Sequence, residues 1–369
     1  MTLGVPKETR EGESRVALTV DLIKKYKKLG LEILIEKSAG LTAGFSDTDF
    51  QKEGCTLVDT NTAWQSDIVL KVNPPTLSEV SLMKKNSLLI SFLESHQNTE
   101  VLNKLALHGV TSFAMELIPR ISRAQSMDAL SSQANIAGYR AVIEAVYHYK
   151  SFFPMLMTSA GSVKAARVFI LGVGVAGLQA IATAKRLGAV VEAYDVRPEV
   201  KEQVQSLGGK FFEVKLEESG VGDGGYAKEL SQTAKEKLQT ALSQSLAKSN
   251  IIITTASVPG KKAPILVSEE VVKSMSLGSV IVDLAAATGG NCALTEAGKI
   301  VRTYGVTIVG IKNFPALLAH DASLFYAKNL FNLLSLMVQI KDDKPSLVID
   351  LNDEIILAAM VTRHGERLK

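Results

Sequence analysis

The segment 119–128, PRISRAQSMD, gathers several polar side chains directly after an apolar run. It contains Arg120, Gln125 and Asp128 at a point that reads as the end of a strand. These groups can hold a polar ligand, because a guanidinium donates hydrogen bonds, a carboxylate accepts them and an amide does both. An arginine–aspartate pair that caps a helix, with Ser126 near the start of that helix, accounts for the same residues equally well. The loop by itself leaves the two interpretations open.

A second stretch that could do chemistry is the turn Gly172-x-Gly174-x-x-Gly177. The spacing alone is a weak signal, but here a β-rich apolar run precedes it and a predicted helix follows it. In such a turn the first glycine permits a tight bend, the second lets backbone amides approach a pyrophosphate, and the third lets helix and strand pack closely. The start of a helix also favours the negative charge of phosphates. The turn, which includes Val175 and Ala176, predicts a dinucleotide-binding site.

An acidic residue ends the next predicted strand, as such a site requires. Asp195 lies 23 residues beyond Gly172. A carboxylate there can accept hydrogen bonds from the ribose hydroxyls and repels a 2′-phosphate, which favours NAD(H) over NADP(H). Arg197, separated from it by Val196, complicates this reading because an arginine can bind a phosphate. With the carboxylate at the end of the strand, we expect NAD(H).

The composition excludes several classes of protein. A chain of 369 residues is too long for one core, so we expect two domains. A net charge of +3 is too small to indicate a nucleic-acid-binding surface. Neither the two cysteines nor the five histidines have the spacing of a metal site. The charged N-terminus does not fit a signal peptide, and the longest weakly polar run, 168–184, carries three glycines. We therefore expect a soluble chain without a metal ion or a nucleic-acid partner.

Short apolar runs alternate with amphipathic stretches from the start of the chain. The predicted strands are 3–5, 31–36, 67–72, 87–92 and 111–115, and the predicted helices between them are 21–30, 75–85 and 98–109. Such alternation is typical of βαβ units, in which a parallel sheet is covered on both faces.

A second α/β series follows a long predicted helix over 126–149. Its predicted strands are 167–174, 190–195, 210–214, 251–256, 279–285 and 306–311. Another helix over 323–340 is expected to return the chain to the first domain, where the tail 353–366 packs. The predicted fold is α/β, with two Rossmann-like doubly wound parallel-sheet domains joined by long helices. The expected domains are 1–125 with 330–369, and 126–329 for the NAD(H)-binding domain.

The segment 215–237 interrupts this pattern with four glycines within 220–225. It cannot form the interior of a strand or a helix. The residues favour a surface loop. The position of the segment in a cofactor domain raises the alternative of a mobile lid, with Gly225 and Tyr226 at the nucleotide.

Several long stretches resemble a single family. They are 119–145, 172–211, 224–229 and the pattern SVIVDLA-x-x-x-GGN over 279–291. All are similar to the NAD(H)-binding domain of the proton-translocating nicotinamide nucleotide transhydrogenase. The similarity covers essentially the whole chain, and the same architecture is shared with alanine dehydrogenase.

The resemblance implies roles for the residues of the first loop. Arg120 and Ser131 would contact the nicotinamide carboxamide, Asp128 would hold the arginine, and Gln125 would project toward a second nucleotide on a partner domain. A carboxamide offers one acceptor and two donors, which suits an arginine donor beside an oxygen acceptor. A fixed carboxamide also fixes the face of the ring, as hydride transfer requires.

The resemblance also extends to the second domain. Tyr226 would close over bound nucleotide, and Ala256 with Ser257 would line the ribose side. The implied activity is direct hydride transfer between NADH on this chain and NADP(H) on a partner subunit, coupled to proton movement across a membrane.

Alanine dehydrogenase is the alternative enzyme, and a non-catalytic NAD(H)-binding module is the alternative outside catalysis. Arg15 and Lys71 match the residues that bind the substrate carboxylate in alanine dehydrogenase. Glu94, however, occupies the position of its catalytic histidine, and Ala287 occupies that of its catalytic aspartate. Transhydrogenases often have an acid at the latter position too, so Ala287 departs from both patterns. Oxidation of an amino acid requires an acid/base group, whereas hydride transfer between two nicotinamides does not. We therefore favour the transhydrogenase and expect Arg15 and Lys71 to be structural charges paired with acids.

The implied partners follow from what the sequence lacks. It has no apolar span of about 20 residues and no second GxGxxG with a basic partner residue. We expect a separately encoded peripheral subunit on the cytoplasmic, inner face of the membrane, inactive without a membrane-embedded subunit and an NADP(H)-binding subunit. The family domain is a dimer, and the resemblance therefore implies a homodimer. We expect the apolar stretches 126–149 and 323–340 to form its interface.

Overall fold

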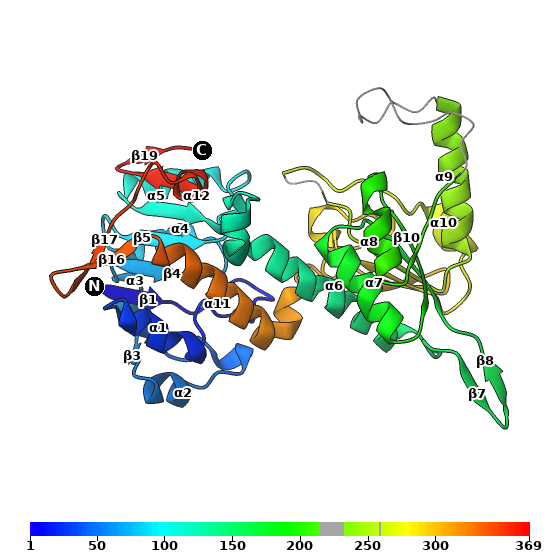
Figure 1. Cartoon of the computed structure of the whole chain (residues 1–369), viewed down its shortest axis with the longest axis horizontal. Helices are drawn as coiled ribbons and strands as arrows, with labels where there is room; N and C mark the ends of the chain where they lie inside the picture. The colour runs from blue at the N-terminus through cyan, green and yellow to red at the C-terminus, as the bar shows by residue number, and fades with distance from the viewer. Residues whose placement is uncertain (215–231, 258–259) are drawn as a thin grey trace. The chain divides into compact units, whose positions relative to one another are not determined.

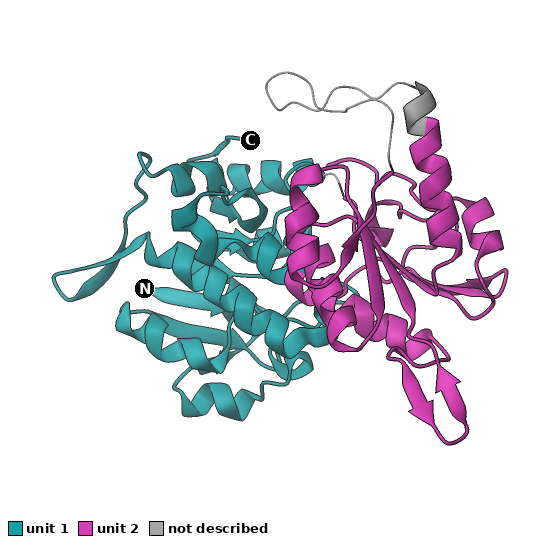
Figure 2. Ribbon diagram, turned by 45° about the vertical axis from the view of Figure 1, so that its right-hand side comes forward, with its two compact units in different colours: residues 1–134, 315–369 teal, residues 135–314 magenta. Residues whose placement is uncertain are grey.

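The computed structural model describes residues 1–214, 232–257 and 260–369, which form two compact units (Figure 2). Unit 1 comprises 1–134 and 315–369, and unit 2 comprises 135–314. Gly225 and Tyr226, with the lid expected of them, lie outside the described residues.

Unit 1 is built on an eight-stranded sheet in the order β19-β18-β6-β5-β4-β1-β2-β3. Figure 1 labels its strands β1, β3, β4, β5 and β19. Its strands are β1 (Thr2–Val5), β2 (Glu32–Glu36), β3 (Thr56–Val58), β4 (Ile68–Leu70), β5 (Leu88–Ser91), β6 (Thr111–Ala114), β18 (Met360–Arg363) and β19 (Glu366–Arg367). Its helices are α1 (Ile23–Lys28), α2 (Asp47–Lys52), α3 (Thr60–Trp64), α4 (Leu77–Leu82), α5 (Thr99–Leu107), α11 (Ala319–Ser335) and α12 (Glu354–Ala359). The strands β1 to β6 are parallel, and β18 adds to β6 in the antiparallel sense.

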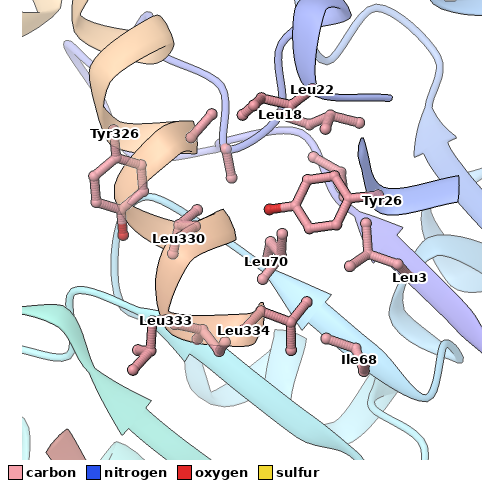
Figure 3. Close-up of a cluster of buried hydrophobic side chains, with 14 of the residues drawn as sticks. Leu3, Leu18, Leu22, Tyr26, Ile68, Leu70, Tyr326, Leu330, Leu333 and Leu334 are labelled. Atoms are coloured by element: carbon pink, nitrogen blue, oxygen red, sulfur yellow. The ribbon is translucent and has the colours of Figure 1, made fainter. Parts of the chain in front are cut away.

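One face of α11 fills the core of unit 1. Tyr326, Leu330, Leu333 and Leu334 are fully buried. They lie against side chains of β1, β4 and the segment around α1 (Figure 3). This apolar face packs inside unit 1. These side chains therefore cannot form the dimer interface that was expected over 323–340.

Unit 2 carries a seven-stranded sheet in the order β11-β10-β9-β12-β13-β15-β14. Its strands are β9 (Arg167–Leu171), β10 (Val190–Tyr194), β11 (Lys210–Phe211), β12 (Ile251–Thr254), β13 (Val280–Asp283), β14 (Ile300–Thr303) and β15 (Val306–Val309), and a separate hairpin is formed by β7 (Leu156–Thr158) and β8 (Gly161–Val163). Its helices are α7 (Val175–Arg186), α8 (Lys201–Ser206), α9 (Gln232–Ala247) and α10 (Glu269–Ser274), while α6 (Ala129–His148) crosses from unit 1 into unit 2.

The two sheets share one topology. Apart from their antiparallel edge strands, each runs in the order third, second, first, fourth, fifth, sixth along its own series. This is the Rossmann order, in which the strand sequence reverses beside the first strand and leaves a crevice at the carboxyl ends of the first and fourth strands. The predicted α/β class with two doubly wound, mainly parallel sheets is confirmed.

The long helices begin and end differently from their predicted spans. Residues 122–127 form a 3-10 turn, and α6 begins at Ala129 because the carboxylate of Asp128 accepts hydrogen bonds from Ser131. At the other end of unit 1, α11 stops at Ser335, and the chain enters a hairpin of β16 (Val338–Lys341) and β17 (Lys344–Leu347). Asp342 and Asp343 make its turn, both with positive φ, as a two-residue turn of this kind requires.

The boundaries between the two units also differ from the expected ones. The sequence placed them at 125/126 and 329/330. Gln133, in the first turns of α6, accepts a hydrogen bond from Arg15 at 2.8 Å and donates one to the carbonyl of Ala322 at 3.0 Å, which ties it to unit 1. Likewise, Ser323 near the start of α11 accepts a hydrogen bond at 3.0 Å from the backbone N–H of Val16, which belongs to unit 1. Unit 1 therefore ends at 134 and resumes at 315.

Candidate functional site

The turn after β9 in unit 2 is shaped by its glycines. Gly172 has φ +95°, and a Cβ on it would lie 2.6 Å from Thr255 Oγ1. A Cβ on Gly177 would lie 2.0 Å from the carbonyl oxygen of Gly172, so the start of α7 is pressed against the turn. A Cβ on Gly174, by contrast, would meet no atom of the described residues within 4 Å. The turn is therefore closed on the protein side and open on the side where Gly174 begins α7.

The open side has the character of an anion site. Among the described residues, no side chain caps the N-terminus of α7, at which Gly174 is the N-cap. Val175 is exposed and Ala176 is partly exposed at this end. The first amides of a helix point outward and carry partial positive charge, which suits a pyrophosphate.

A further glycine, which the motif does not include, supports the same turn. Gly138 lies within α6, and a Cβ there would stand 2.1 Å from the carbonyl oxygen of Ala176. The backbone of α6 therefore packs directly on the first turn of α7. The sequence signal was a lone glycine inside an otherwise helical pattern, which often marks close backbone packing.

Asp195 follows β10 and faces the turn. Its carboxylate accepts hydrogen bonds from the backbone N–H of Val173 at 2.7 Å and from Arg197 Nε at 3.0 Å and Nη2 at 3.1 Å. Burial acts to raise the pKa of Asp195, but the hydrogen bonds from Arg197 and Val173 outweigh it and hold the pKa below its usual value. The group is thus an ionised acceptor, while Val196 beside it is exposed.

The segment after β12 completes the unit 2 group. Thr255 donates from Oγ1 to the carbonyl of Gly172 at 3.0 Å, which joins the ends of β9 and β12. Asn291 donates from Nδ2 to the carbonyls of Ala256 at 2.9 Å and Pro264 at 2.8 Å. Ala256 is thereby fixed, and Ser257 next to it is exposed.

The buried carboxylate of Asp283 organises the loop that carries Asn291. It accepts hydrogen bonds from Thr254 Oγ1, Thr295 Oγ1 and the N–H groups of Ala285, Asn291 and Cys292, at 2.7 to 3.0 Å. Sequence reasoning missed both Asp283 and Asn291 as supports, although they belong to the pattern over 279–291. The signal available was an acid at the end of an otherwise apolar strand.

In unit 1 the loop 119–128 has a different arrangement from the one expected. Asp128 accepts from Ser131 N at 2.9 Å and from Ser131 Oγ at 2.6 Å. Within the described residues it makes no ion pair with Arg120, whose side chain is exposed together with that of Gln125. The expectation that Asp128 holds the arginine is corrected, because a carboxylate at a helix start is satisfied locally by the helix amides.

The residues matched to alanine dehydrogenase also lie in unit 1, and acids neutralise them. Arg15 pairs with Glu13 at 2.6 Å, and Lys71, which is buried, lies 3.5 Å from Glu8 and 3.4 Å from Glu79. Burial acts to raise the pKa of Glu13, yet the hydrogen bonds and charge of Arg15 lower it to about 2.

The two positions matched to acid/base residues of alanine dehydrogenase hold an ion-paired glutamate and an alanine. Glu94 is held by Arg10 in an ion pair of 2.5 Å at the edge of a cavity of about 290 Å³ that Lys71 also lines. Ala287 lies in a short turn of unit 2 and has no titratable group.

Models of one family match both halves of the chain. The N-terminal domain of alanine dehydrogenase/PNT matches residues 4–137, and the C-terminal domain of alanine dehydrogenase/PNT matches residues 141–369. The chain belongs to the alanine dehydrogenase/PNT family. The C-terminal model spans unit 2 and also the segment 315–369, which belongs to unit 1.

Within this family the chain is more similar to transhydrogenase subunits than to alanine dehydrogenases. It is 50% identical to the first portion of the NAD(P) transhydrogenase subunit alpha of Rhodospirillum rubrum, over 99% of this chain and 97% of that protein. It is 47% identical to the NAD(P) transhydrogenase subunit alpha of Haemophilus influenzae, over 100% of this chain and 72% of that protein.

Among solved structures, too, the chain is more similar to a transhydrogenase than to an alanine dehydrogenase. A crystal structure of transhydrogenase from Sinorhizobium meliloti superposes with a TM-score of 0.87 at 42% identity, covering 100% of this chain and 99% of that one. An L-alanine dehydrogenase has a similar fold, with a TM-score of 0.82, but only 25% identity over 100% of this chain and 97% of that one.

Two kinds of feature are absent from the described residues. No helix there is both long and apolar enough to cross a bilayer. The same residues hold no group of three or more histidine, cysteine, aspartate or glutamate side chains placed to bind a metal ion.

Proposed function

We propose that this chain is the NAD(H)-binding component of a proton-translocating transhydrogenase, and that it works with NADP(H) bound on a partner subunit. The observation that carries the proposal is the state of the two acid/base positions: Glu94 is tied to Arg10 at 2.5 Å, and Ala287 cannot titrate. A chain that has neither the histidine nor the aspartate at these two positions suits hydride exchange between two nicotinamides, which moves no proton in the site.

The residues of unit 2 fit NAD(H). Gly174 leaves room for a pyrophosphate, and the amides of Val175 and Ala176 lie at the uncapped start of α7. The ionised carboxylate of Asp195 suits the two ribose hydroxyls. Arg197 directs its guanidinium at Asp195, and an arginine committed to a carboxylate is a poorer ligand for a 2′-phosphate. Val196, Ala256 and Ser257 are proposed to line the adenosine and ribose side.

Residues of the loop 119–128 and of the first turn of α6 supply the contacts proposed for the nicotinamide carboxamide. Ser131 donates its hydroxyl hydrogen to Asp128 at 2.6 Å, so its oxygen is left to accept a hydrogen bond from the carboxamide. Arg120 is exposed and can donate to the carboxamide oxygen. Gln125 is exposed as well, and we assign it a contact with the partner's nucleotide. When bound, NAD(H) supplies the hydride donor or acceptor, and these side chains orient its ring.

The assembly belongs to the same proposal. The NAD(P) transhydrogenase relatives are subunits, and we infer that this chain acts with a membrane-embedded subunit and an NADP(H)-binding subunit on the cytoplasmic, inner face of the membrane. We also infer a homodimer. Four large apolar side chains of α6 are exposed and suit a protein interface: Leu130, Tyr139, Val146 and Tyr147.

The test is to mix the purified chain with an isolated NADP(H)-binding transhydrogenase domain and to follow hydride transfer from NADH to an NADP analogue. We expect transfer only when both proteins are present, and no NADH production from alanine and NAD between pH 7 and 10. Alanine-dependent NADH production would instead assign the chain to the alanine dehydrogenases. Tight NADH binding without transfer to any partner domain would indicate a binding module.

A further inference from the structure

A bidentate ion pair fastens the loop 119–128 to the C-terminal segment of unit 1. Arg123 Nη1 lies 2.8 Å from Asp353 Oδ2, and Nη2 lies 2.7 Å from Oδ1. Two parallel bonds of this kind fix direction as well as distance. Arg123 stands in the 3-10 turn Ser122–Met127, between Arg120 and Gln125.

The carboxylate that receives Arg123 is itself held firmly. Asp353 is the N-cap of α12 and accepts a hydrogen bond from the N–H of Ile355 at 2.8 Å. Ile355 and Ile356 are buried in the core of unit 1. The hydrogen bonds from Arg123 lower the pKa of Asp353 to about 2, so the acid is charged throughout the physiological range. Arg123 is therefore tied to a fixed point and not to a mobile side chain.

A second attachment follows Gln125 in the chain. The carbonyl oxygen of Ser126 accepts hydrogen bonds from Asn329 Nδ2 and Asn332 Nδ2, each at 2.9 Å. The two asparagines stand three residues apart on α11, so they lie on one face of that helix. Gln125 is exposed between these two attachments.

We propose that Arg123 is a positioning residue for hydride transfer, acting through its ion pair with Asp353 to set the place of Gln125. This inference rests on the proposed function. An exposed ion pair adds little to stability, and half of the Arg123 side-chain surface is exposed. Its value is geometric, since a reacting group displaced by about 1 Å can lose on the order of a hundredfold in rate.

The first test needs neither nucleotide nor partner. Asp353→Asn keeps a residue that caps helices well but removes the charge, and Arg123→Gln removes the guanidinium. Hydrogen exchange measured by mass spectrometry should be faster in both variants over 120–127 and unchanged in α1 and β1. Lys24→Gln breaks another exposed ion pair of unit 1, with Glu53 at 2.9 Å, and should leave 120–127 unchanged. Unaltered exchange over 120–127 in both loop variants would overturn the proposal.

The second test measures function. With an NADP(H)-binding partner domain, each variant should slow single-turnover transfer by about tenfold while NADH affinity and melting temperature stay near wild type. The double variant should be no slower than either single variant, because the two residues act as one unit. Arg123→Lys should recover some of the rate. Variants as fast as wild type would refute the positioning role. If the wild-type chain itself transfers nothing, the proposed function fails, and the exchange measurement still decides whether the ion pair holds the loop.

Discussion

The turn 172–177 and the loop 119–128 are held in place by opposite means. The turn takes its shape from its own backbone, in which Gly172 and Gly177 leave no room for a side chain. The loop takes its place from side chains 203 to 230 residues away in sequence, Asn329 and Asp353. A site made of backbone shape tolerates almost no substitution at its glycines, whereas a site held by side chains loses precision before it loses structure. The same contrast separates nucleotide binding from hydride transfer in the proposed function.

The largest effect is expected at the glycines. Gly177→Val should abolish NADH binding and destabilise unit 2 by about 3 kcal/mol, because the new Cβ would lie 2.0 Å from the carbonyl of Gly172. Gly174→Ala is the matched control, since a Cβ there meets no atom within 4 Å in the part of the chain that the structure describes. It should fold like wild type and weaken only nucleotide binding. Urea denaturation and calorimetry measure both quantities, and equal stabilities of the two variants would contradict the tight packing of the turn.

A smaller effect is expected at Asp195. Asp195→Asn keeps the shape of the side chain but removes the charge that faces the ribose. NADH affinity should fall by about tenfold, and the preference for NADH over NADPH should narrow because the repulsion of a 2′-phosphate is lost. Calorimetric titrations with both nucleotides measure the two constants. Wild-type chain with equal affinity for NADH and NADPH would remove the basis of the cofactor assignment.

The smallest effect concerns the pH dependence of the loop's attachment. The pKa of Asp353 is lowered to about 2 in the folded chain, so the stability from its pair with Arg123 is present above the ordinary carboxyl pKa and is lost as the pH falls through about 2. The difference in melting temperature between wild type and Asp353→Asn should be small, constant from about pH 5 to 7 and smaller near pH 2.5. A difference that grows as the pH falls would contradict the assignment.

The contrast between the two regions also explains what could be predicted from the sequence. The turn could be predicted because its signals are local. They are three glycines within six residues, a preceding strand, and Asp195 at the end of the next strand. The doubly wound sheets could be predicted for the same reason, since each strand has its own apolar run in the sequence.

The remaining features depend on contacts between distant residues. The partner of Asp128 could not be read from its spacing to Arg120, because the amide of Ser131 competes for the same carboxylate. No motif or spacing in the sequence indicates that Asp353 pairs with Arg123. Gly138 is visible as a glycine in a helix, but only the fold shows that it faces Ala176.

The central claim is that the turn serves binding and the loop serves transfer, and Gln125→Asn tests it most directly. The substitution shortens the exposed amide by one methylene and leaves both attachments of the loop, Arg123 and Ser126, intact. NADH affinity is measured first by calorimetry, and single-turnover transfer is then measured with an NADP(H)-binding partner domain. We predict an unchanged NADH affinity and a transfer rate lower by up to about a hundredfold, because Gln125 contributes only in the assembled complex. If NADH binding weakens as much as transfer slows, Gln125 is an ordinary cofactor ligand and the division of labour between the two regions is wrong.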